Sequence, residues 1–355
     1  MCPRVLAASL GLALLLSTAA LADETYSPNT VDDFPRRVLW GDTHLHSNLS
    51  LDANMLGNKN LTAADAYKVA RGDTVTAQNG MRVKLRRPLD FLVVSDHAEY
   101  LGVMRGLSLG DEVLLKDATA KRWGDSLAKG DVSPMQEFAT SLAESNRLID
   151  NPEFDRQVWD RALAFAEEYN QPGAFTALIG YEWTSMPGGN NLHRVVVFRD
   201  DAATVTRTLP FSSFDSDDPE DLWRFLDGYE RDTGGEAMSI AHNSNLSGGL
   251  MFALEDSDGN PLSASYAQLR MRQEPLVEVT QYKGDSEAHP YLSPEDEFAD
   301  YESWDRSNIA FSVPHKDDWF AGEYARAALR RGLAVQQKTG ENPFRFGMIG
   351  STDSH

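Results

Sequence analysis

Short apolar runs alternate with longer helical stretches along most of this 355-residue chain, and this alternation constrains the fold more than any other feature. The runs are rich in Val, Ile, Phe and Tyr, as expected of strands that are buried on both faces. They are predicted at residues 38–40, 91–95, 176–181, 193–198, 238–241, 276–281 and 346–350. Seven strands separated mostly by helices predict an α/β fold with a mainly parallel sheet, either closed as a barrel or open.

Several of the intervening stretches carry helix start signals. Asn151 and Asp218 each precede a proline, which is favoured at the first position of a helix. Thr62 is expected to cap a helix over residues 63–71, and Ser133 is expected to cap one that runs to Leu148.

Three further segments complete the expected organisation. Residues 317–338 are predicted to form a long helix, and Asn79-Gly80 predicts a hairpin turn. The segment 254–263 resembles a calcium loop but lacks the closing glutamate, so a turn is expected there. The stretch around 101–174 is predicted to be a helical insert.

The first 22 residues have the pattern of a secretory signal peptide. Arg4 precedes an apolar stretch to Ala20, and Ala20-Leu21-Ala22 has the form of a cleavage site. The run is short for a membrane span, and no second apolar segment of about 18 residues follows. We therefore expect a periplasmic or secreted protein with no stable membrane association after cleavage. A polar arm over 23–36 and one domain over 37–355 are expected to remain.

Composition excludes several kinds of chemistry and partner. Cys2 is the only cysteine and would leave with the signal peptide, which excludes disulfides, cysteine nucleophiles and thiolate metal sites. The formal charge of −21 becomes −22 without Arg4, and such a chain repels phosphate backbones, so nucleic acid is not an expected partner. A small anionic substrate would need a local cationic site, which bound metal ions can supply. The sequence gives no indication of the oligomeric state.

Three N-x-S/T sequons bear on the compartment. They begin at Asn48, Asn60 and Asn245, and a glycan on two of them would obstruct the histidine-rich segments. This favours bacterial export over a eukaryotic secretory route.

The rare histidines and several acids follow the predicted strands. Five of the eight histidines lie where a predicted strand ends. The carboxyl ends of parallel strands share one rim, where active sites are built. The residues placed there are His44, His46, Asp96, His97, Glu99, Glu182, His242, Asp353 and His355.

The spacing of these residues adds geometry. In an extended chain, residues i and i+2 point to the same side, so His44 and His46 converge, as do Asp353 and His355. A single histidine at a strand end is usually a surface or hydrogen-bonded residue. Several imidazoles converging with carboxylates are what divalent ions such as zinc, iron or manganese require. The sequence therefore predicts a site for more than one metal ion.

The motifs "DTHLHSNLSLDA", "TAADAYKVAR", "LDFLVVSDHAEY", "IGYEW", "IAHN" and "STDSH" resemble the PHP (polymerase and histidinol phosphatase) superfamily of metal-dependent hydrolases. The phrases "VVSDHAEYLG", "GYEWTS", "NNLHRVVVF" and "GSTDSH" resemble more closely an exported bacterial branch, DUF3604. The resemblance implies a distorted seven-stranded β/α barrel with two or three divalent ions (Zn, Mn or Fe) at its carboxyl rim. Since the proposed ligand His355 is the final residue, we expect the chain to be truncated after the last strand, without the last barrel helix.

The resemblance also implies a ligand set. The first ion would use His44, His46, Glu182 and Asp353; the second Glu182, His242 and His193; the third His97, His355 and Asp52. Many relatives have histidine near the Asp52 position, whereas others have aspartate, as this chain does. His193 opens its predicted strand and is equally readable as a core histidine. Asp42 and Asp96 are expected to orient ligand imidazoles. For Glu99 the same role and that of a solvated acid stay open.

The expected function is a metal-dependent hydrolase, most simply a phosphoesterase acting on a small substrate through metal-bound hydroxide. Glu182, Asp353 and His242 would form its catalytic centre. Arg194, Lys283 and Arg345 are candidates for contacting the phosphate, although each is equally readable as a surface cation. Hydrolysis of amides, lactones or other esters on the same cluster is an alternative, and so is metal or ligand binding without turnover. Neither a Gly-rich dinucleotide loop nor a G-x-S-x-G elbow occurs.

Overall fold

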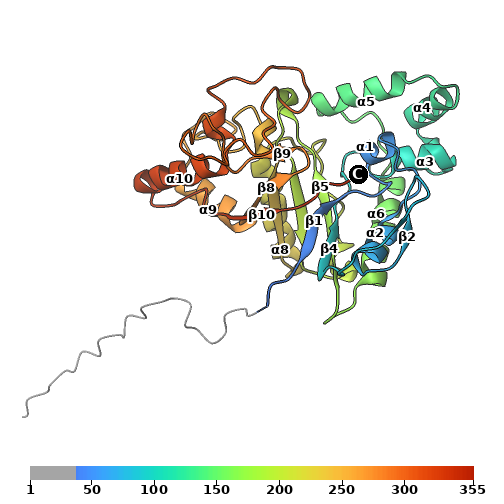
Figure 1. Cartoon of the computed structure of the whole chain (residues 1–355). Coiled ribbons are helices and arrows are strands. Elements are labelled where there is room, and N and C mark those ends of the chain that lie inside the picture. Colours follow the sequence, from blue (N-terminus) through green and yellow to red (C-terminus); the bar gives the residue numbers. More distant parts are fainter. Residues whose placement is uncertain (1–36) are drawn as a thin grey trace, which may run out of the picture. The chain divides into compact units, whose positions relative to one another are not determined.

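The computed structural model describes residues 37–355, which place one curled sheet among helices (Figure 1). The predicted signal peptide (1–22) and arm (23–36) lie outside the described residues. Residues Leu39–His355 form one structural unit. Within the described part of the chain, no helix has both the length and the apolar character that crossing a bilayer requires.

Seven strands curl into a half-barrel in the order β1-β4-β5-β6-β7-β8-β10, and β9 pairs with β8 beside this path. Neighbouring strands on the path run parallel except β6, which is antiparallel to both β5 and β7. The predicted α/β fold with a mainly parallel sheet is confirmed. The strands are β1 Gly41–Leu45, β4 Phe91–Val94, β5 Thr176–Trp183, β6 Arg194–Phe198, β7 Ala237–His242, β8 Leu276–Gln281, β9 Gly284–Asp285 and β10 Gly347–Gly350.

The first and last strands of this path meet where the strands end. The amide of Asp353 donates to the carbonyl of His44 at 2.8 Å, and the amide of His46 donates to the carbonyl of Ser354 at 2.9 Å. Leu45 and Ser354 form a parallel bridge. The segment that follows β10 therefore joins the two edges of the curl at the rim that carries the histidines.

Helices cover the outer side of the sheet. Helices α2 and α6 pack on each other and on β4 and β5, while α8 and α9 pack on β7. The α-helices are α1 Leu51–Met55, α2 Ala63–Ala70, α3 Val103–Leu109, α4 Ala118–Ala128, α5 Ser133–Ala143, α6 Pro152–Tyr169, α7 Ala202–Val205, α8 Pro219–Thr233, α9 Ala264–Gln273 and α10 Ala325–Thr339. Short 3-10 helices occur at Leu114–Lys116, Pro187–Gly189, Ser244–Leu246 and Phe320–Gly322.

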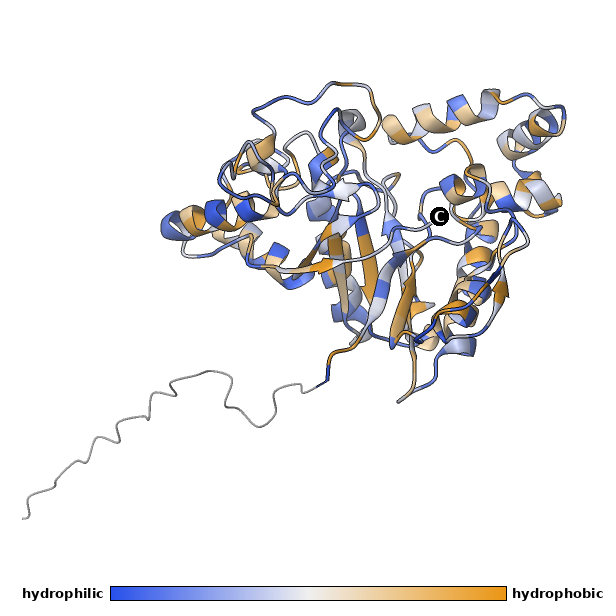
Figure 2. Ribbon diagram, viewed as in Figure 1, coloured by the Kyte–Doolittle hydropathy of each residue, from blue (hydrophilic) through white to orange (hydrophobic). Residues whose placement is uncertain are grey.

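The core lies between the sheet and these helices, and the central strands are the most apolar part of the ribbon (Figure 2). Trp159 of α6 meets Tyr181 of β5 edge to face, with ring centroids 6.0 Å apart, and Tyr181 in turn packs on Phe198 of β6. This packing fixes α6, β5 and β6 relative to one another.

Several local predictions are confirmed. The side chains of Asn151 and Asp218 accept hydrogen bonds from the first turns of α6 and α8. Thr62 caps α2 in a capping box with Asp65. The hairpin around Asn79-Gly80 pairs β2 Val75–Thr76 with β3 Arg82–Val83.

The strand predicted at residues 38–40 is wrong. Val38, Leu39 and Trp40 are 65, 58 and 57 % exposed, and β1 begins at Gly41. The true strand carries Asp42 and His44 on its buried side, so its inward residues are polar. Hydropathy misplaces the strand because the site itself occupies the side that an ordinary strand fills with apolar residues.

Two predicted helices differ from the structure. Ser133 is the first residue of α5 rather than its cap, and α5 ends at Ala143, near Ser145 in the left-handed conformation (φ 49°). The helix predicted over 317–338 begins only at Ala325, because the carbonyl of Gly322 accepts a hydrogen bond from the amide of Phe252 in another segment.

The predicted insert at 101–174 is not one unit. Its last helix, α6, packs against α2 and β5 and belongs to the layer that covers the sheet. Helices α3, α4 and α5 form the additional part.

Candidate metal centre

Glu182 stands at the centre of the site, near the end of β5, with a side chain that is 1 % exposed. Its Oε1 lies 2.7 Å from Nδ1 of His193 and 3.1 Å from Nε2 of His242. Its Oε2 lies 3.1 Å from Nε2 of His44 and 3.2 Å from Nε2 of His46. Each carboxylate oxygen therefore faces a different pair of imidazoles, which is the arrangement of a bridging ligand.

Four groups of side chains at or beside Glu182 could hold metal ions. In each, one nitrogen or oxygen per residue lies within 4.8 Å of the others. The structure thus brings together all nine predicted ligand residues. The first group is His44, His46 and Asp353; the second is Glu182, His193 and His242; the third is His46, Asp52, His97 and His355; the fourth is His44, His242 and Glu278.

The antiparallel strand explains why His193 belongs to the site. It immediately precedes β6 at Arg194, and β6 runs against both of its neighbours. The amino end of an antiparallel strand lies at the same rim as the carboxyl ends of the parallel strands. A histidine that opens a strand is therefore placed beside Glu182.

Hydrogen bonding around His46 tests whether the residues fit a cation. The hydroxyl of Ser50 donates to Asp96 at 2.9 Å, so it accepts from Nδ1 of His46 at 2.7 Å. In the neutral ring, the form that binds a metal, this leaves the lone pair on Nε2, which has no hydrogen-bond partner and lies 3.2 Å from oxygens of both Glu182 and Asp353. A lone pair facing two carboxylates is stabilised when a cation lies between them. Ligand atoms about 3 Å apart suit ions with bonds of about 2.0–2.2 Å, so the residues fit divalent metals.

Charge interactions set the protonation of the central residues. Burial alone would raise the pKa of Glu182, but His97 and His242 outweigh it and hold the pKa well below its usual range. Burial lowers the pKa of His193 to about 4, against the opposing effect of Glu182. At neutral pH Glu182 is therefore ionised and His193 neutral, as metal ligands must be.

His97 differs from these residues. Burial works against its protonated form, but Asp52 and Glu182 outweigh burial and raise the pKa of His97 to about 10. Its Nε2 lies 3.0 Å from Asp52, and its Nδ1 lies 2.6 Å from the hydroxyl of Thr184. An ion bound at the third group has to displace this proton.

Asp96 has the orienting role that the sequence predicts, through an intermediary. It accepts from Ser50, which contacts His46, and from the amide and hydroxyl of Ser47 at 2.6 and 2.7 Å. The same prediction is wrong for Asp42, which accepts from the amide of His44 and the hydroxyl of Thr352. Asp42 therefore holds the main chain of His44 and the side chain of Thr352, and it contacts no imidazole. The group that His44, two residues further along β1, presents to Asp42 is its backbone amide.

Glu99 is a buried acid rather than a solvated one. Its Oε1 accepts from the amides of Thr184 at 3.2 Å and Ser213 at 2.6 Å. It therefore holds two loops behind His97, since Thr184 also carries the hydroxyl that contacts that ring.

The three candidate phosphate contacts are placed very differently. Arg194 is fully buried and pairs with Glu274 at 3.0 Å, and Arg345 is exposed just before β10, at the opposite end of the sheet. Neither residue is at the site, so the sequence-based prediction is wrong for both. For Arg194 the reason is that successive side chains of a strand point to opposite faces, so it points away from the side that His193 faces. Lys283 does lie at the site, where its Nζ pairs with Asp353.

Two buried polar residues at the site were missed by the sequence-based prediction. Both oxygens of Glu278 lie 3.2 Å from Nδ1 of His44. The amide nitrogen of Gln281 donates to Asp353 at 2.5 Å. Both residues lie on β8, within a run that the sequence predicts to be a buried strand. An acidic residue inside such an apolar run is unusual, and this signal could have identified Glu278.

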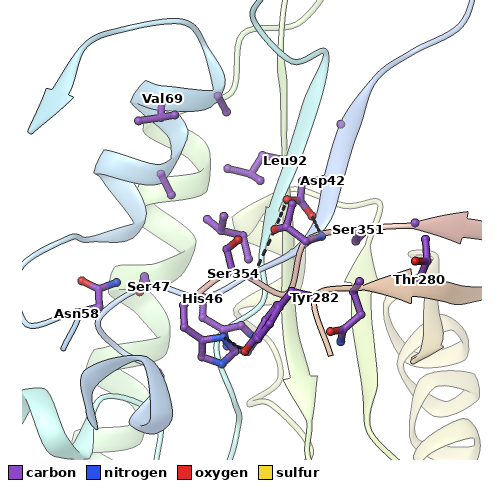
Figure 3. Close-up of a pocket in the computed structure, with 18 of the residues that line it drawn as sticks. Asp42, His46, Ser47, Asn58, Val69, Leu92, Thr280, Tyr282, Ser351 and Ser354 are labelled. Atoms are coloured by element: carbon purple, nitrogen blue, oxygen red, sulfur yellow. Dashed lines mark hydrogen bonds between the residues drawn. The ribbon is translucent and has the colours of Figure 1, made fainter. Parts of the chain in front are cut away.

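A cavity of about 1520 Å³ opens beside the third group. His46, Tyr282 and His355 line it at the rim, and apolar side chains of α2 and β4 line its other end, where Figure 3 places Val69 and Leu92. The hydroxyl of Tyr282 lies 3.1 Å from Nδ1 of His355. The cavity gives small molecules access to this side of the cluster.

Fold and site together define an α/β protein whose curled sheet carries buried His/Asp/Glu groups that could hold metal ions. The chain belongs to the family described as protein of unknown function DUF3604, whose model matches residues 33–355. This confirms the resemblance to DUF3604. Among curated proteins, none matches the chain.

Proposed function

We propose that this protein is an exported bacterial metal-dependent phosphoesterase of the PHP type. The observation that carries the proposal is the division of the Glu182 oxygens between two pairs of imidazoles. Adjacent divalent ions, here Zn, Mn or Fe, lower the pKa of bound water and neutralise charge on a phosphoryl group. The half-barrel is proposed to be a distorted seven-stranded barrel of that superfamily, and export rests on the signal-peptide pattern of residues 1–22.

Lys283 supports a phosphate ester over a neutral amide. Burial works against its charge, but Asp353 outweighs burial and raises the pKa of Lys283, so the ammonium group stays charged at neutral pH. It stands beside the first ligand group, where it can donate to a phosphoryl oxygen. Such charge-assisted hydrogen bonds contribute about 1.5–3 kcal/mol. The formal net charge of −21 makes this local cation more significant for an anionic substrate.

A substrate panel tests the proposal. The protein loaded with Zn, Mn or Fe is expected to hydrolyse small phosphomonoesters or phosphodiesters. Turnover of amides, lactones or carboxylic esters alone would replace the phosphoesterase proposal with the wider hydrolase alternative. Tight metal binding with no turnover of any substrate in the panel would favour a binding protein.

Lys283→Gln tests the phosphate contact, and because Lys283 pairs with the proposed ligand Asp353, the metal content of the variant is measured beside its KM. The variant is expected to raise KM for phosphate esters roughly 10-fold or more, in line with the loss of one charge-assisted hydrogen bond. Arg345→Gln, at the opposite end of the sheet, is the matched control and should keep the parental KM. An unchanged KM in Lys283→Gln would remove Lys283 from substrate binding.

A further inference from the structure

Glu278 belongs to the fourth candidate group, with His44 and His242, but the ligand set implied by the resemblance gives it no role. Its side chain is fully buried, with 0 % exposed, on β8. Within residues 37–355, its carboxylate has one hydrogen-bond partner, Nδ1 of His44, at 3.2 Å from each oxygen. Burying a carboxylate with a single imidazole as its partner costs free energy of folding. This cost indicates that the contact has a role in the site.

The strand register places Glu278 beneath the cluster. Its Cα is paired with that of His242 on β7 and with that of Ile349 on β10. His44 and His242 lie close together above it, with ring centroids 4.2 Å apart. Glu278 thus lies against His44 and close to His242, and it is not among the residues that line the cavity.

We propose that Glu278 is a positioning residue that holds His44 in the tautomer required for metal binding. A carboxylate only accepts hydrogen bonds, so the hydrogen shared with His44 lies on Nδ1. In the neutral imidazole that binds a metal, the lone pair is then on Nε2, which lies 3.1 Å from Glu182 and 3.3 Å from Asp353. Nε2 is therefore the atom presented to the first ligand group.

The neighbouring histidine supports this assignment. His46 is held in the same tautomer by Ser50, which is itself fixed by Asp96. The H-x-H pair thus has two separate supports, a direct carboxylate for His44 and a serine-aspartate relay for His46. Ligand histidines commonly donate their second N–H to such groups, and loss of the partner typically weakens metal binding 10–100-fold.

The inference rests on the proposed metal centre but not on the proposed hydrolysis. Its test is zinc affinity of the full chain, measured by competition with a chromophoric chelator. Glu278→Gln is expected to weaken the tightest zinc site 10–100-fold. The amide can turn its NH₂ toward Nδ1, which moves the imidazole hydrogen to Nε2 and blocks the ligand atom.

Glu274→Gln is the matched control. Glu274 is equally buried, but it pairs with Arg194 and Arg270 and with no histidine. This variant is expected to lose stability and to keep the parental zinc affinity, which separates a weakened fold from a misplaced ligand. Parental affinity in Glu278→Gln would overturn the inference while leaving the metal centre intact. A parent chain that binds no zinc would overturn both.

A second measurement needs no variant at position 278. Nitrogen-15 spectra of histidine-labelled protein distinguish the two tautomers, and His44→Asn identifies the His44 signals. His44 is expected to carry its hydrogen on Nδ1 in the zinc-loaded protein. A hydrogen on Nε2 would contradict the role assigned to Glu278, even if Glu278→Gln does not fold.

Discussion

Glu182 carries more of the site than any other residue. Its two oxygens contact four imidazoles within 3.2 Å, and its side chain is buried. A neutral amide at this position offers one oxygen instead of two and removes the negative charge that offsets adjacent cations. Loss of this residue should therefore affect two ion sites at once.

The first prediction follows from that sharing. Glu182→Gln is expected to retain at least one divalent ion fewer per chain than the parent, measured by elemental analysis after dialysis against a weak chelator. Glu137→Gln, which alters an exposed pair with Arg122, is the control and should keep the parental content. Equal metal content in Glu182→Gln and the parent would contradict a bridging role.

The second prediction concerns pH and His97. Its folded pKa of about 10 lies above the unfolded value of about 6.5. The folded state therefore binds more protons between these values, and stability falls as pH rises through them. Without metal, the parent is expected to lose stability relative to His97→Gln from pH 6.5 to 10, by up to a few kcal/mol. Urea unfolding checks this, and a difference that does not change with pH would contradict it.

At the scale of elements, close packing on β5 holds the ligand-bearing strands in place. Gly180 lies two residues before Glu182, and an added Cβ would stand 2.5 Å from both the carbonyl oxygen of Val196 and a methyl group of Val93. Strand β5 can thus approach β6 closely only because this residue has no side chain. The geometry of the centre depends on this approach.

The third prediction uses two glycines with opposite surroundings. Gly180→Ala is expected to destabilise the fold by about 1–3 kcal/mol, because the sheet must move to admit the methyl group. Gly228→Ala, inside α8 where the nearest atom is 3.6 Å away, is expected to stabilise it by about 0.5–1 kcal/mol. Unfolding midpoints in urea measure both. Equal effects of the two substitutions would contradict the packing described for β5.

The fourth prediction compares a true cap with a misassigned one. Thr62→Ala removes the capping box of α2 and should cost about 1 kcal/mol. Ser133→Ala removes an exposed hydrogen bond from the first residue of α5 to Asp131, which precedes the helix, and should change stability by less than about 0.5 kcal/mol. A larger loss in Ser133→Ala would show that the boundary of α5 is wrong.

Patterns local to the chain were sufficient for most elements, and the misses have physical causes. Caps at Thr62, Asn151 and Asp218 act within one turn and are readable in sequence. The start of β1 could not be read from the sequence, because its buried residues are the polar Asp42 and His44 rather than apolar ones. The end of α5 could not be read from the sequence either, because Ser145 adopts a left-handed backbone conformation that serine does not usually favour.

The site was predictable to a similar extent. Seven of the nine proposed ligands follow from strand ends, whereas Asp52 and His193 follow from the resemblance alone. The roles of Glu278 and Lys283 depend on contacts between segments far apart in sequence. Glu278 and His44 are separated by 234 positions, and no local pattern relates them.

For the whole molecule, metal binding and folding should be coupled. The ligands come from segments between residues 44 and 355, so an ion can bind them together only in the folded chain. Such an ion stabilises the folded state by about 4 kcal/mol when its concentration is 1,000 times its Kd.

The fifth prediction follows from this coupling. Removing metal with a chelator is expected to lower the unfolding temperature, and adding zinc or manganese in excess is expected to restore it. The shift should be smaller in Glu182→Gln than in the parent. A parent whose unfolding temperature responds to neither treatment would show that the ligand groups do not hold ions.

Anomalous X-ray scattering from crystals of the zinc-loaded protein tests the central claim most directly, because it locates each ion. Two or three peaks are expected around Glu182, with zinc about 2.0–2.2 Å from its carboxylate oxygens and from the imidazole nitrogens that face them. Crystals of zinc-treated protein with no anomalous peak within bonding distance of Glu182 would contradict the account.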